Sequence, residues 1–347
     1  MEKRKLGKTD IDVSILCLGT MTYGTQNTPA EAFEQMDYAV DEGINFFDTA
    51  ELYAIPPSAE TYGRSEEIVG DWFQKTGKRK DVVLATKVAG PGGFPWIRGG
   101  NIRHDRAQIT EALNHSLKRL KTDYIDLYQI HWPQRAVNSF GKMDYDQTSV
   151  SGREGDVILE ILQVAEDFIK AGKIRMLGVS NETPWGIMTY IRHHLSKNLP
   201  HIVSVQNAYS LLNRTFEIGH AEIALQEKVG LLAYSPLGGG TLTGKYLNGQ
   251  VPKGSRWDID PRTSRYKRPR LDETVSAYMA VAKKYSLDPV QMALAFVNQQ
   301  AFVTSNIFGA TKMDQLKNNV ASARLRLAPE AVQEINAVHR LTPNPCP

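Results

Sequence analysis

Short runs of apolar residues alternate along the chain with longer stretches in which apolar residues recur every three or four positions. The short runs are typical of strands buried on both faces, and the longer stretches are typical of amphipathic helices. Strands are predicted over 15–18, 44–47, 82–87, 124–130, 174–179, 202–205, 231–233 and 307–308. Helices are predicted over 30–42, from Ser65 onward, and over 105–120, 156–171, 184–196, 216–228, 272–285, 289–300, 312–321 and 329–339.

Regular alternation of strands with helices predicts a parallel α/β sheet. Eight such units in a chain of 347 residues fit a closed (β/α)8 barrel, or TIM barrel, better than an open doubly wound sheet. Residues 3–14 are predicted to form an N-terminal β-hairpin, and extra C-terminal helices follow the last unit. Segment 236–270 is rich in Gly, Pro, Arg and Lys and is expected to be a loop. We expect a single domain over 1–347.

Charge and cysteine usage narrow the possible partners and the compartment. A formal net charge of +3 is too small to argue for a nucleic-acid surface. No apolar run approaches the length of about 18 residues that suggests a membrane span, and the basic start lacks the apolar stretch of a signal peptide. Cys17 and Cys346 lie at opposite ends of the chain, which does not suggest a disulfide framework. We therefore expect a cytoplasmic protein without nucleic-acid or membrane partners; the sequence leaves its oligomeric state open.

Polar residues stand at the C-terminal ends of all eight predicted strands. In a closed barrel these ends share one rim, where the active sites of this fold lie. The residues are Thr20, Asp48, Lys87, His131, Asn181, Gln206, Ser235 and Thr311.

Four residues near the first strand ends suggest proton transfer to oxygen. Tyr53 follows Asp48 by five residues, and its phenol would be a poor acid near neutrality unless Lys87 lowered its pKa. Asp48 would neutralise and orient Lys87, and His131 would hydrogen-bond the same substrate oxygen. Carbonyl reduction needs such a general acid, with hydride from a cofactor. Taken singly, each residue also fits a purely structural role.

The chain resembles the aldo-keto reductases, most closely their bacterial Tas-type members, from Lys5-Leu6-Gly7 to the last helix. The most specific motifs are Phe47-Asp48-Thr49-Ala50, Leu127-Tyr128-Gln129-Ile130-His131, Gly178-Val179-Ser180-Asn181 and Ala233-Tyr234-Ser235-Pro236-Leu237. The resemblance implies a catalytic tetrad with Tyr53 as the acid, assisted by Asp48, Lys87 and His131. It also implies NADPH bound on the barrel rim without a Rossmann fold.

The resemblance further implies which residues contact NADPH. Asn181 and Gln206, with Ser180 beside them, would hold the nicotinamide carboxamide, and Tyr234 would stack on the nicotinamide ring. Many relatives carry an Arg at the position of Gln315 to bind the 2′-phosphate, a role that Lys312 and the hydroxyl of Thr311 would replace here. The full implied set is Thr20, Met21, Ser180, Asn181, Gln206, Tyr234, Ser235, Pro236, Leu237, Gly239, Lys245, Gly309, Thr311, Lys312, Gln315, Asn318 and Asn319.

Three local alternatives remain open in the sequence. Tyr53 is followed by Ala54 and an insert over 55–61, so that Tyr62-Gly63 imitates the Tyr-Gly pair usual in the family; the five-residue offset favours Tyr53. Gly239–Lys245 matches a phosphate-binding P-loop until Tyr246, where Ser or Thr would be needed. Segment 256–270 is interpreted as a mobile flap over the phosphates, with a plain solvated loop as the alternative.

Two functions fit these residues. The first is an NADPH-dependent reductase of a small aldehyde or ketone, with an apolar pocket suggested by Trp96, Trp132 and Trp185. The second is a nucleotide-binding redox sensor or regulator with little turnover, like the potassium-channel beta subunits of the family. A metal-dependent hydrolase has little support, since only His131 stands at a strand end as a candidate ligand. We expect no metal.

Overall fold

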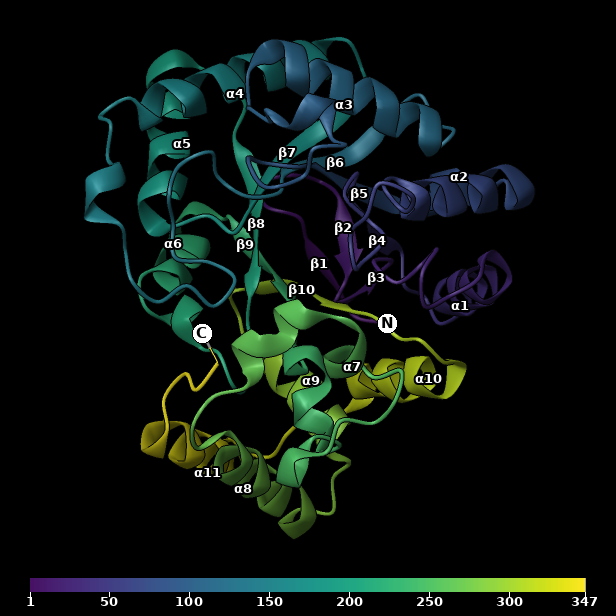
Figure 1. Cartoon of the computed structure of the whole chain (residues 1–347), viewed down its shortest axis with the longest axis vertical. Coiled ribbons are helices and arrows are strands. Elements are labelled where there is room, and N and C mark those ends of the chain that lie inside the picture. Colours follow the sequence, from purple (N-terminus) through teal and green to yellow (C-terminus); the bar gives the residue numbers. More distant parts are fainter. Residues whose placement is uncertain (347) are drawn as a thin grey trace.

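A closed barrel of parallel strands forms the centre of the computed structural model, which describes residues 1–346 (Figure 1). Around the barrel the strands run in chain order, and the last one pairs with the first. They are β3 (Leu16–Gly19), β4 (Phe46–Asp48), β5 (Val83–Val88), β6 (Ile125–Ile130), β7 (Ile174–Ser180), β8 (Ile202–Ala208), β9 (Gly230–Tyr234) and β10 (Val303–Phe308). The predicted fold class is therefore confirmed.

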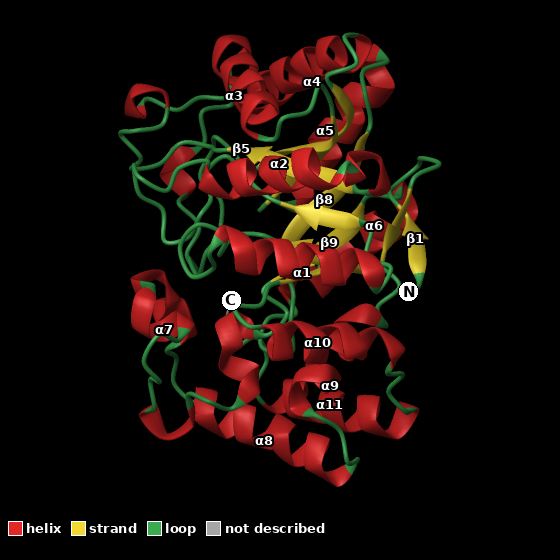
Figure 2. Cartoon of the chain, turned by 90° about the vertical axis from the view of Figure 1, so that its right-hand side faces the viewer, coloured by secondary structure: helices red, strands yellow, loops and turns green. Residues whose placement is uncertain are grey.

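Helices cover the outside of the barrel (Figures 1 and 2). They are α1 (Pro29–Asp41), α2 (Arg64–Thr76), α3 (Arg106–Arg119), α4 (Glu154–Lys170), α5 (Pro184–Lys197), α6 (His220–Glu227), α9 (Pro289–Asn298) and α10 (Met313–Ala321). Two further helices, α8 (Leu271–Lys284) and α11 (Pro329–Leu341), pack against each other beyond this layer. Local capping fixes several starts: Thr28 and Glu31 form a capping box at α1, and Asp105 caps α3.

The hairpin of β1 (Lys3–Lys5) and β2 (Asp12–Ser14) closes the N-terminal end of the barrel. Leu6 and Val13 pack in one cluster with Phe46 and Val83, the first residues of β4 and β5. With that end plugged by apolar side chains, the C-terminal rim is left for the site.

The last strand is longer than predicted. It begins at Val303 rather than at residue 307. Thr304, Ser305 and Asn306 belong to the strand and are buried, but they are polar and so do not extend the apolar run in the sequence. Ser305 Oγ donates to the Ser14 carbonyl over 2.7 Å, and Asn306 Nδ2 donates to Asn298 Oδ1 over 2.9 Å. These bonds offset the cost of burying polar groups, and the apolar run that marks the other strands is missing.

The helix predicted over 216–228 is also interrupted. A 3-10 turn, η4 (Thr215–Glu217), precedes α6, and Gly219 between them has a φ of +85°. A positive φ is incompatible with a continuous right-handed helix, and glycine adopts it at little cost.

The segment expected as a loop over 236–270 contains short helical turns. They are η5 (Gly238–Thr243), η6 (Leu247–Gly249), α7 (Arg256–Ile259) and η7 (Pro261–Tyr266). The buried carboxylate of Asp260 binds Arg256 and Arg262, and so ties α7 to the start of η7. The other 3-10 turns are η1 (Lys78–Asp81), η2 (Arg98–Gly100), η3 (Gln147–Ser149) and η8 (Ser322–Arg324).

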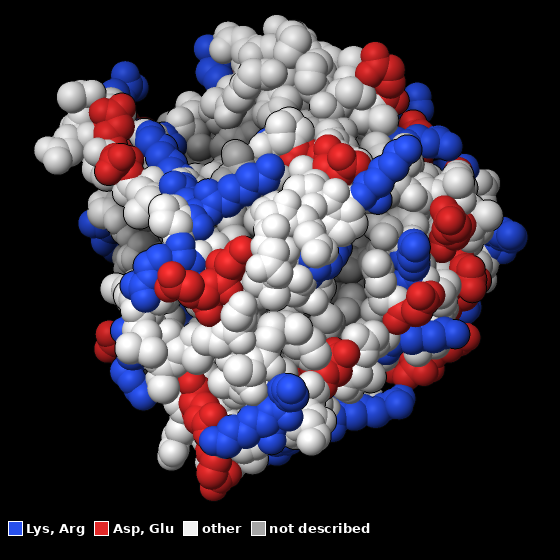
Figure 3. Space-filling view, turned by 60° about the horizontal axis from the view of Figure 1, so that its bottom comes forward, with Lys and Arg blue, Asp and Glu red and all other residues white. Residues whose placement is uncertain are grey.

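Two surface properties bear on partners. Within the described residues, no helix combines the length and the apolar character needed to cross a bilayer. On the face shown in Figure 3, basic and acidic side chains are intermingled.

Candidate active site

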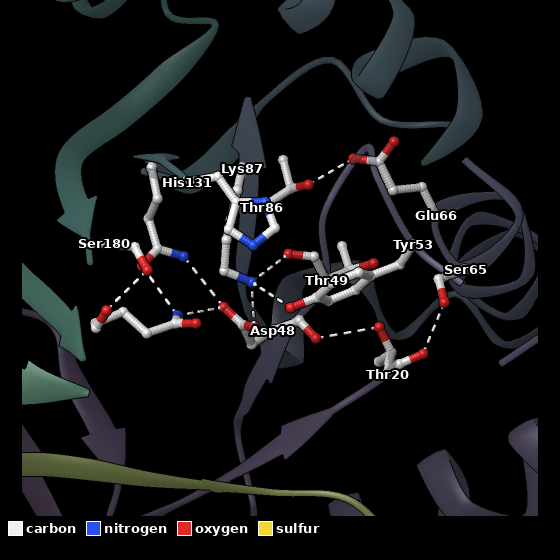
Figure 4. A network of polar contacts seen from close by, with 12 residues as sticks. Thr20, Asp48, Thr49, Tyr53, Ser65, Glu66, Thr86, Lys87, His131 and Ser180 are labelled. Atoms are coloured by element: carbon white, nitrogen blue, oxygen red, sulfur yellow. Dashed lines mark hydrogen bonds and ion pairs between the residues drawn. The ribbon is translucent and has the colours of Figure 1, made fainter. Parts of the chain in front are cut away.

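A buried ion pair lies at the C-terminal end of the barrel interior. Lys87 of β5 has no exposed surface, and its Nζ lies 2.5 Å from Asp48 Oδ1 and 2.8 Å from the carbonyl oxygen of Thr49 (Figure 4). Burial acts to lower the pKa of Lys87, but Asp48 and Tyr53 together outweigh it and raise that pKa above the ordinary value. The lysine is therefore a charged ammonium held by its partner.

The hydroxyl of Tyr53 lies 3.4 Å from Lys87 Nζ, and the same nitrogen lies 4.8 Å from the centroid of the tyrosine ring. Burial raises the pKa of Tyr53 above its ordinary value, although the Lys87 ammonium acts in the opposite direction. The net lowering that the sequence suggested is thus wrong for this structure, since desolvation of the phenolate exceeds the attraction of the ammonium. The phenol carries its proton at neutral pH.

His131, directly after β6, completes the cluster. Its ring meets that of Tyr53 edge to face, with 5.7 Å between centroids. Burial, assisted by Lys87, holds the pKa of His131 well below its usual range, so the imidazole is neutral. Nδ1 is buried without a hydrogen-bond partner among the described residues. An orphaned buried donor is rarer than an under-satisfied acceptor, which favours the tautomer with its proton on Nε2.

The second oxygen of Asp48 binds two glutamine amides. Gln206 Nε2 donates to Oδ2 over 2.9 Å, and Gln129 Nε2 donates to the same oxygen over 3.1 Å. Gln129 was missed in the sequence because it lies inside β6 rather than at the end of the strand. Its position two residues before His131 is the available signal, since alternate strand residues share a face.

A cavity of about 1480 Å³ opens above these groups. Asp48, Tyr53 and His131 line it, whereas Lys87 lies fully buried beneath. Usual small-molecule sites measure roughly 300–1,000 Å³, so this one has room for a large ligand and a second small one. It brings together the predicted cofactor contacts Met21, Ser180, Asn181, Gln206, Tyr234, Ser235, Pro236, Leu237, Gly239, Lys245, Gly309, Thr311, Lys312, Gln315, Asn318 and Asn319.

Thr20 differs from the other predicted contacts. It is fully buried, it is not among the lining residues, and its Oγ1 donates to the backbone carbonyl of Asp48 over 3.1 Å. The structure therefore places Thr20 behind the site, and its contact with a cofactor stays a prediction.

Hydrogen bonds between strand ends fix the part of the cavity nearest Tyr53. Tyr234 Oη donates to Asn181 Oδ1 over 2.7 Å, and Asn181 Nδ2 donates to the carbonyl of His131 over 2.8 Å. Ser180 Oγ donates to the carbonyl of Gln206 over 2.7 Å. The ring of Tyr234 is therefore held in place on the cavity wall.

Another part of the cavity lies at the start of α10. The backbone N–H and Oγ1 of Thr311 both donate to Gln315 Oε1, over 3.0 Å and 3.2 Å, so this glutamine is engaged within its own turn. Lys312 lines the cavity and forms no ion pair with any described residue. It is thus the cation available to an anionic group in this part of the cavity.

Loops form the remaining walls. Trp132 lines the cavity, its Nε1 donates to the Pro91 carbonyl over 2.8 Å, and Phe94 packs on its ring. Of the other two tryptophans predicted for the pocket, Trp96 packs in the loop cluster beside it, and Trp185 is 48% exposed on α5; neither lines the cavity.

Segment 256–270 lies against the cavity. Arg256 and Tyr266 line it, and Arg268 Nη2 donates to the Gly141 carbonyl over 3.2 Å. This contact joins the segment to the loop over 136–142, which forms another wall. The segment is therefore a wall of the site in this structure, and its role as a flap over phosphates stays a prediction.

Two alternative sites gain no support. The P-loop look-alike over 239–245 forms 3-10 turns rather than leading directly into an α-helix. Among residues 1–346, no group of three or more His, Cys, Asp or Glu side chains is arranged to hold a metal ion.

Comparison with known proteins shows the family to which the chain belongs. The model of the aldo/keto reductase family matches residues 15–340. Protein tas of Escherichia coli (strain K12) is 48% identical over 349 residues, covering 100% of both chains. The aldo-keto reductase YhdN of Bacillus subtilis (strain 168) is 30% identical and covers 97% of this chain and 93% of its own. A probable voltage-gated potassium channel subunit beta of Oryza sativa subsp. japonica is also 30% identical, over 99% and 98%. The chain therefore belongs to the aldo/keto reductase family, a family of oxidoreductases.

Proposed function

We propose that this protein reduces the carbonyl group of a small aldehyde or ketone with NADPH. The observation that carries the proposal is the distance of 3.4 Å between the Tyr53 hydroxyl and Lys87 Nζ at the base of the cavity. A protonated phenol beside a fixed ammonium is suited to give a proton to an oxygen on which negative charge develops.

In this proposal each of four residues has one role. Bound NADPH supplies the hydride for the carbonyl carbon. Tyr53 gives its proton to the carbonyl oxygen, and Lys87 stabilises the phenolate that remains. Asp48 keeps Lys87 charged and in position. His131, neutral, donates a hydrogen bond from Nε2 to the same oxygen and so helps to orient the substrate.

The lining residues suit a dinucleotide. Tyr234 offers an immobilised ring for stacking on the nicotinamide, and Asn181 and Gln206 offer amides to its carboxamide. Lys245, two residues after the glycine-rich turn η5, lines the cavity, and so does Lys312. Lys245 suits the pyrophosphate, and Lys312 suits the 2′-phosphate. The proposed contact of Lys312 with the 2′-phosphate is the reason for proposing NADPH rather than NADH.

We place this activity in the cytoplasm. Cys17 and Cys346 are both free and buried, which suits a reducing compartment.

The direct test is turnover. Purified protein is incubated with NADPH and a panel of aliphatic and aromatic aldehydes and ketones, and oxidation of NADPH is followed by absorbance. We expect substrate-dependent oxidation, with the alcohol as product. Tight NADPH binding without turnover of any panel member would contradict the proposal.

That negative outcome would favour a second function, a nucleotide-binding redox sensor or regulator. The similarity to a probable potassium channel subunit beta supports it, because that relative matches nearly the whole chain. A regulator would bind NADPH and NADP⁺ with different effects on a partner, while its turnover remained near zero.

A further inference from the structure

Gln129 is buried without exposed surface inside the barrel, yet its side chain ends in a polar amide. Its Nε2 donates to Asp48 Oδ2 over 3.1 Å, and its Oε1 accepts from Gln206 Nε2 over 3.1 Å. The side chain therefore bridges the carboxylate that holds Lys87 and an amide that lines the cavity.

The neighbouring strand makes room for this bridge. A Cβ added to Gly178 on β7 would lie 3.2 Å from Gln129 Cγ and 2.8 Å from Ser204 Oγ. Any larger residue at 178 would displace the glutamine or the serine. A glycine in the middle of a buried strand marks such a close approach.

The bridge fixes which way the Gln206 amide faces. A carboxylate only accepts hydrogen bonds, so the NH₂ group of Gln206 must face Asp48. Its two hydrogens are used on Asp48 Oδ2 and Gln129 Oε1. The Oε1 atom of Gln206 accepts no hydrogen bond from a described residue and is the atom left for a ligand in the cavity.

We propose that Gln129 is a positioning residue that locks the Gln206 amide with its oxygen toward the nicotinamide carboxamide, while it holds Asp48 against Lys87. This inference rests on one part of the proposed function, the placement of the nicotinamide beside Gln206. It does not depend on whether the protein reduces a carbonyl substrate. One side chain would thus link nicotinamide binding to the ion pair beneath Tyr53.

The experiment compares two ligands that differ in the nicotinamide. NADPH carries it, whereas 2′-phospho-ADP-ribose lacks it and keeps the adenosine and phosphate groups. In Gln129→Met, which keeps the length but loses both hydrogen bonds, we expect the Kd for NADPH to rise roughly tenfold. The Kd for 2′-phospho-ADP-ribose should stay within about twofold of the unaltered protein. A merely structural role would weaken both ligands alike.

Gln129→Glu is the conservative variant. Two buried carboxyl groups about 3 Å apart cannot both ionise, so the introduced group shares a proton with Asp48 and still offers a donor to it. At pH 6 we expect its Kd for NADPH to lie within about threefold of the unaltered protein. Ser204→Ala is the matched control: its hydroxyl is buried on β8 two residues before Gln206 and binds no described residue. It should change neither Kd.

The outcomes separate this inference from the proposed function. Equal weakening of both ligands in Gln129→Met, or no weakening, would overturn the role of Gln129. If that variant does not fold, a Gln129→Glu protein that folds but binds NADPH more than about tenfold more weakly at pH 6 would overturn it too. Absence of aldehyde reduction with the ligand-selective effect intact would overturn only the proposed function.

Discussion

The hydroxyl of Tyr62 donates to the buried carboxylate of Glu51 over 3.0 Å. The same carboxylate binds Arg98 Nη1 at 2.6 Å and the backbone N–H of Ala89 at 2.6 Å. Tyr62 is therefore part of a separate buried network. Burial is the main cause that raises its pKa far above the ordinary value, and the Glu51 carboxylate raises it further. Of the two tyrosines that the sequence offered as proton donors, Tyr53 has the ammonium beside it.

We predict opposite results for the two tyrosines. Tyr53→Phe should lower kcat for aldehyde reduction by about 10²–10⁴-fold, because it removes the general acid, while the Kd for NADPH stays nearly unchanged. Tyr62→Phe should keep kcat within a few-fold but lower the free energy of unfolding by about 1–3 kcal/mol, because Glu51 loses a donor. Steady-state kinetics and urea unfolding measure both. If Tyr62→Phe abolished turnover and Tyr53→Phe did not, Tyr62 would be the general acid and Tyr53 the structural residue.

The ion pair of Asp48 and Lys87 predicts strongly non-additive stability changes. Lys87→Met should lower the free energy of unfolding by about 3–5 kcal/mol, because it leaves a buried carboxylate without its cation. The double variant Asp48→Asn with Lys87→Met should recover most of that loss, since no isolated charge remains. Urea unfolding of the two single variants and the double variant completes the cycle. Strictly additive losses would show that the pair is not coupled.

Lys312 predicts cofactor choice. Lys312→Ala should weaken NADPH by roughly tenfold or more and leave NADH unchanged, because only NADPH carries the 2′-phosphate. Lys317, on the same helix, lies over the ring of Tyr38 and does not line the cavity, so Lys317→Ala is the matched control. Fluorescence titration gives both affinities. Equal losses for NADPH and NADH would remove Lys312 from phosphate discrimination.

His104 predicts how stability depends on pH. It is 1% exposed, and burial lowers its pKa from 6.5 to about 4, although a contact with the backbone of Ala89 acts in the opposite direction. Between pH 4 and pH 6.5 His104 is protonated in the unfolded chain but neutral in the folded chain. The free energy of unfolding therefore rises with pH in this range. The contribution is fully present above pH 6.5 and is lost as the pH falls toward 4.

The matching variant is His104→Leu. Its free energy of unfolding should depend less on pH between 6.5 and 4, by about 1.4 kcal/mol per pH unit, or about 3 kcal/mol over the window. Urea unfolding across this range measures the difference. Parallel curves for the variant and the unaltered protein would show that His104 becomes protonated in the folded state.

Sequence periodicity was sufficient for most of the barrel, including β5 and β6 with their buried Lys87 and Gln129, but it missed the start of β10, where three successive residues are polar. The start of β10 was missed because Ser305 and Asn306 satisfy their hydrogen bonds through distant partners, Ser14 and Asn298. The same limit hid the role of Gln129, whose partners come from β4 and β8. Such bonds form only after the strands have assembled, so no local pattern reports them.

The candidate site divides along the same line. Strand-end residues such as Asp48 and His131 could be found from the sequence, because the rim of a barrel gathers them whatever the loops do. The direction of the pKa shift of Tyr53 could not, because it depends on how far burial outweighs one neighbouring charge. The enclosing walls were equally hidden, since the contact of Arg268 with Gly141 joins segments far apart in the chain.

That division of labour has an evolutionary consequence. Asp48, Lys87 and His131 are anchored on or directly after core strands, whereas the enclosing surfaces over 136–142 and 252–268 consist of loops and short helical turns outside the barrel strands. Insertions and exchanges in such surface segments are tolerated far better than changes in a packed sheet. Substitutions and insertions in these two segments can therefore change which substrates related proteins accept, while the residues assigned to proton transfer stay the same.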